Sequence, residues 1–120
     1  MKRLVVDVDN TICFTSAGDY ENAQPDHGLI RRLTEYKQQG FEIVLFSSRN
    51  MRTYDRKIGL INVHTLPPLL EWLDRHKVPY DEVILGKPWC GTEGFYVDDR
   101  AVRPAEFKNM SYVEISELLG

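Results

Sequence analysis

Short apolar segments alternate with longer segments of helical spacing along most of this chain. Residues 3–8, 41–46, 82–85 and 94–97 are short and rich in β-branched or aromatic side chains, which is typical of buried strands. Strands that alternate with helices fold as right-handed βαβ units around a parallel sheet. The sequence therefore predicts one α/β domain over residues 1–120, a Rossmann-like three-layer fold with a mostly parallel central sheet.

Local signals predict where the main helices begin and end. Residues 26–39 show helical spacing, with Asp26 as the expected N-cap and Gly40 as the stop. A second helix is expected to open at Thr65, because two prolines fit in its first turn. A third is expected over residues 111–119 at the end of the chain.

The connection before the fourth predicted strand is short. Only the residues from Lys87 to Phe95 separate the end of the third strand from the start of the fourth. A parallel crossover usually takes a dozen or more residues, often with a helix. Either this connection is an extended loop that crosses the sheet, or the predicted strand boundaries are displaced.

Composition excludes several classes of protein and of partner. The 15 Lys and Arg against 18 Asp and Glu give a net charge of −3, which argues against a nucleic-acid partner. No apolar run approaches the roughly 18 residues that span a bilayer, so we expect no membrane partner. The start of the chain lacks the apolar core of a signal peptide. Cys13 and Cys90 are in neither metal-type nor CxxC spacing, which indicates reduced thiols and a cytoplasmic location.

Polar residues follow each predicted strand at its carboxyl end. Because the carboxyl ends of parallel strands meet at one edge of a sheet, and ligands bind there, these residues are expected to share a site. In strand order they are Asp7 and Asp9, then Ser47, then Lys87, and finally Asp98 and Asp99.

The spacing of the carboxylates fits phosphoryl transfer. A carboxylate can attack phosphorus to form an aspartyl-phosphate. A divalent cation is needed between two anions, and Mg²⁺ prefers hard oxygen ligands of this kind. Asp7 and Asp9 would meet the ion from one strand end, and Asp98 or Asp99 would add a further ligand from another. Asp9 could also act as general acid and then as general base.

Other residues near this edge are candidates for binding the substrate. Thr11 and Ser47 offer hydroxyl donors, and Lys87 offers a charge for phosphate oxygens. Trp89 could stack on a sugar ring or fill a gap in the fold. Arg49 begins a basic segment, residues 49–64, that could bind a second anionic group or be a solvated loop or helix face.

Four segments resemble, in the same order, the four motifs of the haloacid dehalogenase-like phosphohydrolases. The resemblance implies that Asp7 is the nucleophile, that Asp9 is the acid/base, and that Ser47, Lys87 and the Asp98–Asp99 pair complete the site. The segments are Asp7-Val8-Asp9-Asn10-Thr11, Phe46-Ser47-Ser48-Arg49, Gly86-Lys87-Pro88 and Tyr96-Val97-Asp98-Asp99.

The resemblance also implies an activity. An acidic residue at Asp9 is typical of the family's phosphatases and phosphomutases. Gly86-Lys87-Pro88-Trp89 and the stretch after Tyr96 look like a small subgroup associated with bacterial capsular-polysaccharide biosynthesis. We therefore expect a Mg²⁺-dependent phosphatase that acts on a small-molecule phosphate monoester, a sugar or polyol phosphate.

Larger members of the family carry a cap domain, and this chain has no room for one. Residues 12–25 and 50–64 are too short for a folded cap. The open site would accept a large substrate or be closed by a neighbouring subunit in a homo-oligomer. A phosphomutase needs its phosphoenzyme shielded from water, so the short insertions argue against one. A phospho-accepting signalling module remains a third hypothesis, although the order of the acidic residues favours the hydrolase.

Overall fold

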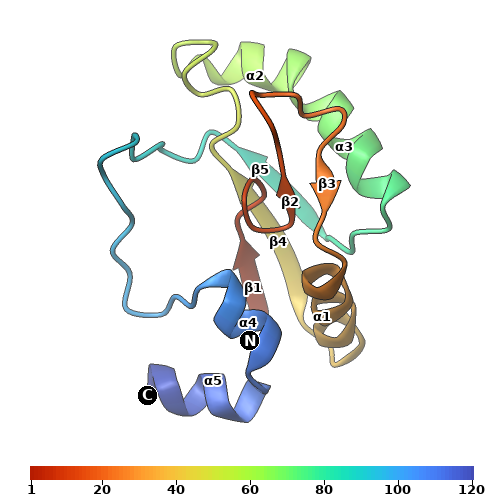
Figure 1. The fold of residues 1–120 in the computed structure, drawn as a ribbon, viewed down its shortest axis with the longest axis vertical. Helices are drawn as coiled ribbons and strands as arrows, with labels where there is room; N and C mark the ends of the chain where they lie inside the picture. Colours follow the sequence, from red (N-terminus) through yellow and green to blue (C-terminus); the bar gives the residue numbers. More distant parts are fainter. The chain divides into compact units, whose positions relative to one another are not determined.

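The computed structural model describes residues 1–120, which divide into two compact units. The N-terminal unit is Met1–Trp89 and the C-terminal unit is Cys90–Gly120. Figure 1 labels the helices and strands of both in chain order. No helix in either unit is long and apolar enough to cross a lipid bilayer.

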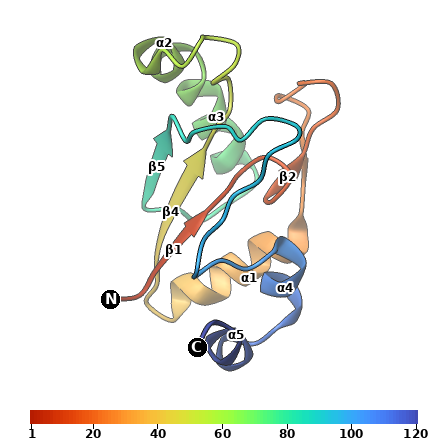
Figure 2. The ribbon, with the colours of Figure 1, turned by 90° about the vertical axis from the view of Figure 1, so that its left-hand side faces the viewer.

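A parallel sheet of three strands forms the centre of the N-terminal unit (Figures 1 and 2). The strand order is β1-β4-β5, and both neighbouring pairs are parallel. This confirms the predicted α/β class and the parallel central sheet. The first strand ends before Asp7, earlier than the predicted range 3–8, because the chain turns there. The strands are β1 (Arg3–Val6), β4 (Glu42–Ser47) and β5 (Glu82–Leu85).

Helices lie beside this sheet on one side. The first begins after Asp26, whose carboxylate accepts a hydrogen bond from the Leu29 N–H at 3.1 Å, as the sequence predicted. The third begins after Thr65, also as predicted. Both connections step across the sheet in the same direction, so right-handed crossovers place the first and third helices on the same face (Figure 1). The helices are α1 (His27–Gln38), α2 (Ile58–His64) and α3 (Leu66–Arg75).

Apolar side chains fill the space between these helices and the sheet. Ile43 and Leu45 of β4 are fully buried, as are Leu69 and Leu73 of α3 and Leu33 of α1. Full burial of one such side chain contributes about 1.5–3 kcal/mol relative to its exposed state. The core therefore lies directly under the strands whose ends carry the candidate site residues.

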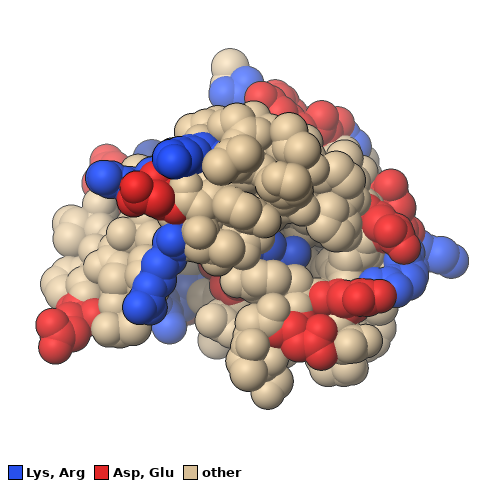
Figure 3. Space-filling view, turned by 90° about the horizontal axis from the view of Figure 1, so that it is seen from above, with Lys and Arg blue, Asp and Glu red and all other residues tan.

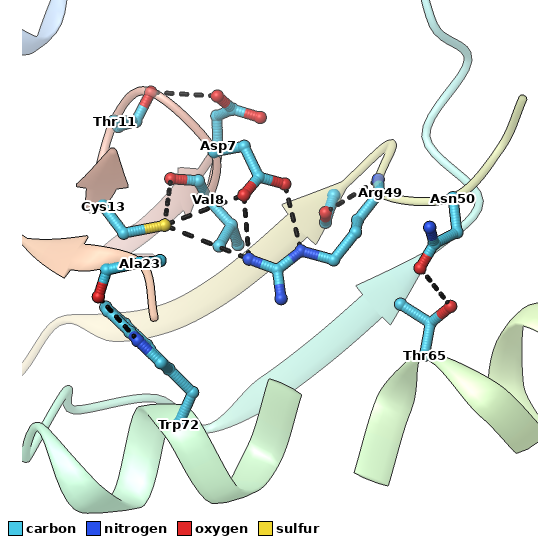
Figure 4. A network of polar contacts seen from close by, with 11 residues as sticks. Asp7, Val8, Thr11, Cys13, Ala23, Arg49, Asn50, Thr65 and Trp72 are labelled. Carbon is cyan, nitrogen blue, oxygen red and sulfur yellow. Dashed lines mark hydrogen bonds and ion pairs between the residues drawn. The ribbon is translucent and has the colours of Figure 1, made fainter. Parts of the chain in front are cut away.

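Residues 12–25 contain a small hairpin instead of a folded cap. Its strands, β2 (Cys13–Phe14) and β3 (Gln24–Pro25), are antiparallel. The Trp72 indole N–H of α3 donates a buried hydrogen bond of 3.1 Å to the carbonyl of Ala23, beside this hairpin (Figure 4). The predicted absence of a cap in this segment is thus confirmed.

The C-terminal unit contains two helices. The predicted helix over 111–119 is confirmed, because the Ser111 hydroxyl accepts from the Glu114 N–H at 3.1 Å and the Glu114 carboxylate accepts from the Ser111 N–H at 2.9 Å. The shorter helix before it was not predicted. They are α4 (Pro104–Asn109) and α5 (Tyr112–Leu119).

The predicted strand at residues 94–97 is wrong. These residues belong to no strand, and Figure 2 draws the chain between β5 and α4 without an arrow. The side chains of Phe95 and Val97 are 78% and 88% exposed. An apolar, aromatic sequence becomes a strand only where a neighbouring backbone receives its hydrogen bonds.

Candidate active site

Three of the predicted site residues lie at the carboxyl edge of the sheet. Asp7 follows β1 directly, Ser47 is the last residue of β4, and Lys87 comes shortly after β5. The Lys87 N–H donates to the Ser47 carbonyl at 3.1 Å, which ties the ends of β4 and β5 together. Figure 3 shows the molecule from above the view of Figure 1, and basic and acidic side chains are interspersed on that face.

Two side chains hold the carboxylate of Asp7. The Thr11 hydroxyl donates to Oδ2 at 2.9 Å (Figure 4), and Lys87 Nζ lies 3.3 Å from Oδ1. The turn after β1 makes the first contact possible: the Ile12 N–H donates to the Val8 carbonyl at 2.8 Å, and the chain curls back over Asp7. The Asp7 side chain is still 36% exposed. Since each carboxylate oxygen can accept more than one contact, Asp7 keeps room for a further ligand.

Asp9 has a different partner. Arg49 Nη2 lies 2.8 Å from Oδ1 and Arg49 Nε lies 3.1 Å from Oδ2, so the pair is bidentate. The Arg49 side chain is only 3% exposed, and its guanidinium lies 4.2 Å from the centroid of the Tyr20 ring. Arg49 is thus part of the buried support of Asp9. Its predicted contact with substrate stays a prediction.

Ser47 is 1% exposed. Its Oγ accepts a hydrogen bond from the Arg49 N–H at 3.0 Å, and its own O–H is left to donate. This contact fixes the backbone that leads from β4 into Arg49. A direct contact between Ser47 and a phosphate group stays a prediction.

Cys13 lies under the same cluster but does not have the properties of a nucleophile. Its side chain is fully buried. Burial, followed by the negative charge of Asp9, raises the pKa of the Cys13 thiol from 9.0 to about 12. Burial also raises the pKa of Tyr20. Because the thiolate is the reactive form of cysteine, Cys13 is inert at neutral pH.

Trp89 and the basic segment 49–64 surround the edge less closely. Trp89 is 45% exposed, and the Arg52 guanidinium lies 6.0 Å from its ring centroid. His64 stacks on Tyr54 with ring centroids 5.5 Å apart. Exposed aromatic and basic groups are thus present for a sugar phosphate, and their predicted contacts stay predictions.

Asp98 and Asp99 belong to the C-terminal unit and are exposed. Asp98 Oδ1 accepts a hydrogen bond from the Arg100 N–H at 2.8 Å, a local turn of the kind that aspartate often makes. Neither unit by itself holds a group of three or more His, Cys, Asp or Glu side chains placed to bind a metal ion. The predicted ligand set, which draws on both units, stays a prediction.

The donor chemistry at the edge suits Mg²⁺. Asp7 is a partly exposed carboxylate whose two contacts leave acceptor positions open. Hard oxygen ligands from one or two carboxylates, completed by water and phosphate, are the usual surroundings of this ion. Asp9 fits less directly, because both of its oxygens already contact Arg49.

A solved structure matches this chain over nearly its whole length. It is the crystal structure of a structural-genomics target from Vibrio cholerae, with a TM-score of 0.97 and 55% sequence identity, covering 99% of this chain and 97% of that one. The chain belongs to the same family as that Vibrio cholerae protein. The description of that protein names no activity. No family model and no curated protein matches the chain.

Sequence reasoning missed two features of this site. It did not connect Arg49 with Asp9, and it gave no role to Tyr20, on which Arg49 stacks. Both contacts join residues that are far apart in sequence, and no spacing within the motif-like segments indicates either contact. Only the general tendency of a buried arginine to need a carboxylate partner could have indicated the first.

Proposed function

We propose that this protein is a Mg²⁺-dependent phosphatase that hydrolyses a phosphate monoester through an aspartyl-phosphate. The observation that carries the proposal is the setting of Asp7, a partly exposed carboxylate at the carboxyl end of β1, held by Thr11 and Lys87. The order of the motif-like segments supports the same chemistry. The proposed substrate is a small sugar or polyol phosphate of the kind used in capsular-polysaccharide biosynthesis, and the proposed location is the cytoplasm.

The reaction would proceed in two steps. Asp7 attacks phosphorus in line, the bond to the leaving alcohol breaks, and the alcohol takes a proton from Asp9. Water then gives a proton to Asp9 and attacks the aspartyl-phosphate, which releases inorganic phosphate and restores Asp7. Lys87 offsets the negative charge that gathers at Asp7 during both steps.

The pair between Asp9 and Arg49 has a consequence for the first step. Both Asp9 oxygens accept hydrogen bonds from Arg49, so Asp9 can donate a proton to the alcohol only when this pair opens. A substrate phosphate competes with carboxylates for guanidinium groups. The proposal therefore includes a change of partner: when substrate binds, the Arg49 guanidinium gives up part of its contact with Asp9 and contacts the substrate phosphate.

Mg²⁺ would be held by Asp7 and Asp9 together with Asp98 and Asp99. When bound, the ion supplies positive charge that allows an anionic nucleophile to approach an anionic phosphate. Lys87 alone, a single charge 3.3 Å from Asp7, cannot balance a phosphate dianion in addition to several carboxylates.

The exposure of Asp7 helps to distinguish a phosphatase from the two alternatives, a phosphomutase and a phospho-accepting signalling module. A phosphomutase must keep water from its phosphoenzyme, and a carboxylate that is 36% exposed favours hydrolysis instead. A phospho-accepting signalling module would hold its phosphate without turnover. Continuous release of inorganic phosphate therefore separates the phosphatase from both.

Phosphate release from p-nitrophenyl phosphate in the presence of Mg²⁺ tests the proposal. We expect Asp7→Asn to lower turnover by at least about 10³-fold, because the amide is not a nucleophile. Asp55→Asn is the matched control, since Asp55 is an exposed carboxylate of the same unit, and it should retain full activity. Near-native turnover in Asp7→Asn, or full activity of the wild type with a chelator, would contradict the proposal. A screen of phosphorylated sugars and polyols would then identify the substrate class.

A further inference from the structure

Residues 94–97 have the sequence of a strand, but their side chains are exposed and no neighbouring strand pairs with them. The side chains of Phe95, Tyr96 and Val97 are 78%, 52% and 88% exposed, and the segment belongs to no sheet. Phe95 and Val97 are two residues apart, so in an extended chain they share one face. Large apolar groups exposed together in this way mark a surface that is covered by something else.

The sheet of the N-terminal unit has a free edge. β1 pairs with β4 on one side only, and its Val5 is 63% exposed. An edge strand presents unpaired N–H and C=O groups that can receive another strand. β1 carries no proline or bulge that would block such pairing.

We propose that residues 94–97 of one chain pair in parallel with β1 of a second copy of this chain, and that the exchange is reciprocal. The lengths match in register: β1 covers Arg3–Val6 and is followed by Asp7, and the segment 94–97 is followed by Asp98. Pairing in that register brings the partner's Asp98 beside Asp7. Insofar as it concerns catalysis, this inference rests on the proposed function, and it makes each site a product of two chains.

Residues 86–93, the connector between β5 and the segment 94–97, favour pairing with a second copy over pairing within the same chain. Within one chain, residues 86–93 would have to cross three strand spacings, about 14 Å, and return about 13 Å along the strand, around the side chains on the sheet face. Parallel crossovers usually take a dozen or more residues. The connector also turns tightly, since a Cβ added at Gly94 would lie 2.3 Å from the Cys90 carbonyl oxygen. Short connectors of this kind favour exchange between chains.

The mass in solution tests the exchange without any need for activity. Size-exclusion chromatography with light scattering should give about twice the 14.0 kDa of one chain. The double variant Phe95→Lys/Val97→Lys should be a monomer, because charged side chains block edge pairing. The matched control, Leu60→Lys/Val63→Lys, changes two exposed apolar residues of α2 (43% and 64% exposed) and should remain a dimer. A monomeric wild type would overturn the proposal.

Lengthening the connector gives an independent measurement. A flexible insertion of about eight Gly and Ser residues after Gly91 should let residues 94–97 reach β1 of their own chain, and the product should be a folded monomer. This variant keeps every apolar side chain, so it guards against misfolding of the lysine variant. A dimer that survives both the insertion and the lysine substitutions would overturn the proposal.

Mixed dimers test whether the partner's acids complete the site. Asp7→Asn and Asp98→Asn/Asp99→Asn chains should each be inactive alone. Refolded together, they should regain roughly a quarter of wild-type activity, because about half of the dimers are mixed and each of those has one intact site. If the refolded wild type is active but the refolded mixture of the two variants stays inactive, the proposed exchange would be overturned. Phosphatase activity in a monomer would overturn the interface alone, whereas a dimer without phosphatase activity would overturn the proposed function alone.

Discussion

β1 and residues 94–97 are two short apolar segments of equal length, each followed by an aspartate, and only one of them is a strand. β1 has β4 beside it and a buried core beneath its neighbour. Residues 94–97 belong to no sheet, and Val97 is 88% exposed. The comparison shows that a strand-like sequence allows a segment to pair with another strand. Which strand it pairs with is determined by the length and path of the segments that connect them.

The aspartates that follow the two segments differ accordingly. Asp7 is held by Thr11 from the next turn and by Lys87 from the far strand. Asp98 is exposed and accepts its bond from the Arg100 N–H two residues along. The first carboxylate is already oriented, whereas the second needs a partner strand to orient it.

The largest expected effect concerns this second carboxylate. Asp98→Asn/Asp99→Asn should lower phosphatase activity by about 10³-fold, because the proposed metal site would lose two of its four carboxylates. The free energy of unfolding should change by less than about 0.5 kcal/mol, since both side chains are exposed. Steady-state rates and urea titrations measure the two quantities. A large loss of stability with normal activity would reverse the roles that we give to the two segments.

Removal of the charge beside Asp7 should have a smaller effect on activity. Lys87→Met keeps the length of the side chain and removes the ammonium group that lies 3.3 Å from Asp7. We expect turnover to fall by roughly 10²-fold, as for the loss of other groups that stabilise charge in a transition state. Lys77→Met is the control, because Lys77 is an exposed lysine shortly after α3 and outside the basic segment 49–64. Equal rates in both variants would remove Lys87 from the site.

Removal of the guanidinium group that pairs with Asp9 should lower the free energy of unfolding. Arg49→Gln leaves a carboxylate whose side chain is only 23% exposed without its guanidinium partner. We expect a loss of about 2–4 kcal/mol in the free energy of unfolding, measured in urea. Arg52→Gln, an exposed change in the same segment, should cost less than about 0.5 kcal/mol. Equal losses would show that the buried pair does not stabilise the N-terminal unit.

The last expected effect is absent at neutral pH and concerns the stability of the protein at alkaline pH. The pKa of Cys13 rises from 9.0 in the unfolded chain to about 12 in the folded one, so the folded state keeps a proton that the unfolded state loses. The resulting contribution is complete below pH 9 and declines as pH rises from 9 toward 12, by at most about 1.4 kcal/mol per pH unit. The difference in unfolding free energy between the wild type and Cys13→Ala should therefore shrink over this range. A constant difference would contradict the raised pKa.

Much of the fold was predictable because its signals are local. The N-caps Asp26 and Ser111 precede helices in the structure, and the prolines after Thr65 mark the start of α3. α2 was missed because Lys57 at its N-cap makes no side-chain cap bond. Residues 94–97 were misassigned because their local pattern is that of a strand and pairing is not a local property.

In the candidate site, the positions of the residues at strand ends were predictable, but their contacts were not. The positions of Asp7, Ser47 and Lys87 follow from strands that end at one edge of a parallel sheet. The contact between Asp9 and Arg49 depends on how two turns pack together, and no spacing in the sequence indicates it. Residue types at strand ends can thus be assigned in advance, whereas the partners that orient them cannot.

Chemical trapping at Asp7 tests the central claim most directly. An aspartyl-phosphate is an acyl phosphate, and reduction by borohydride converts its aspartate to homoserine. The wild-type protein, quenched during turnover of p-nitrophenyl phosphate with Mg²⁺ and then reduced, should carry this change at position 7 when its peptides are analysed by mass spectrometry. Modification at Ser47 or Cys13 instead, or an unmodified Asp7 in an enzyme that is turning over, would contradict the account.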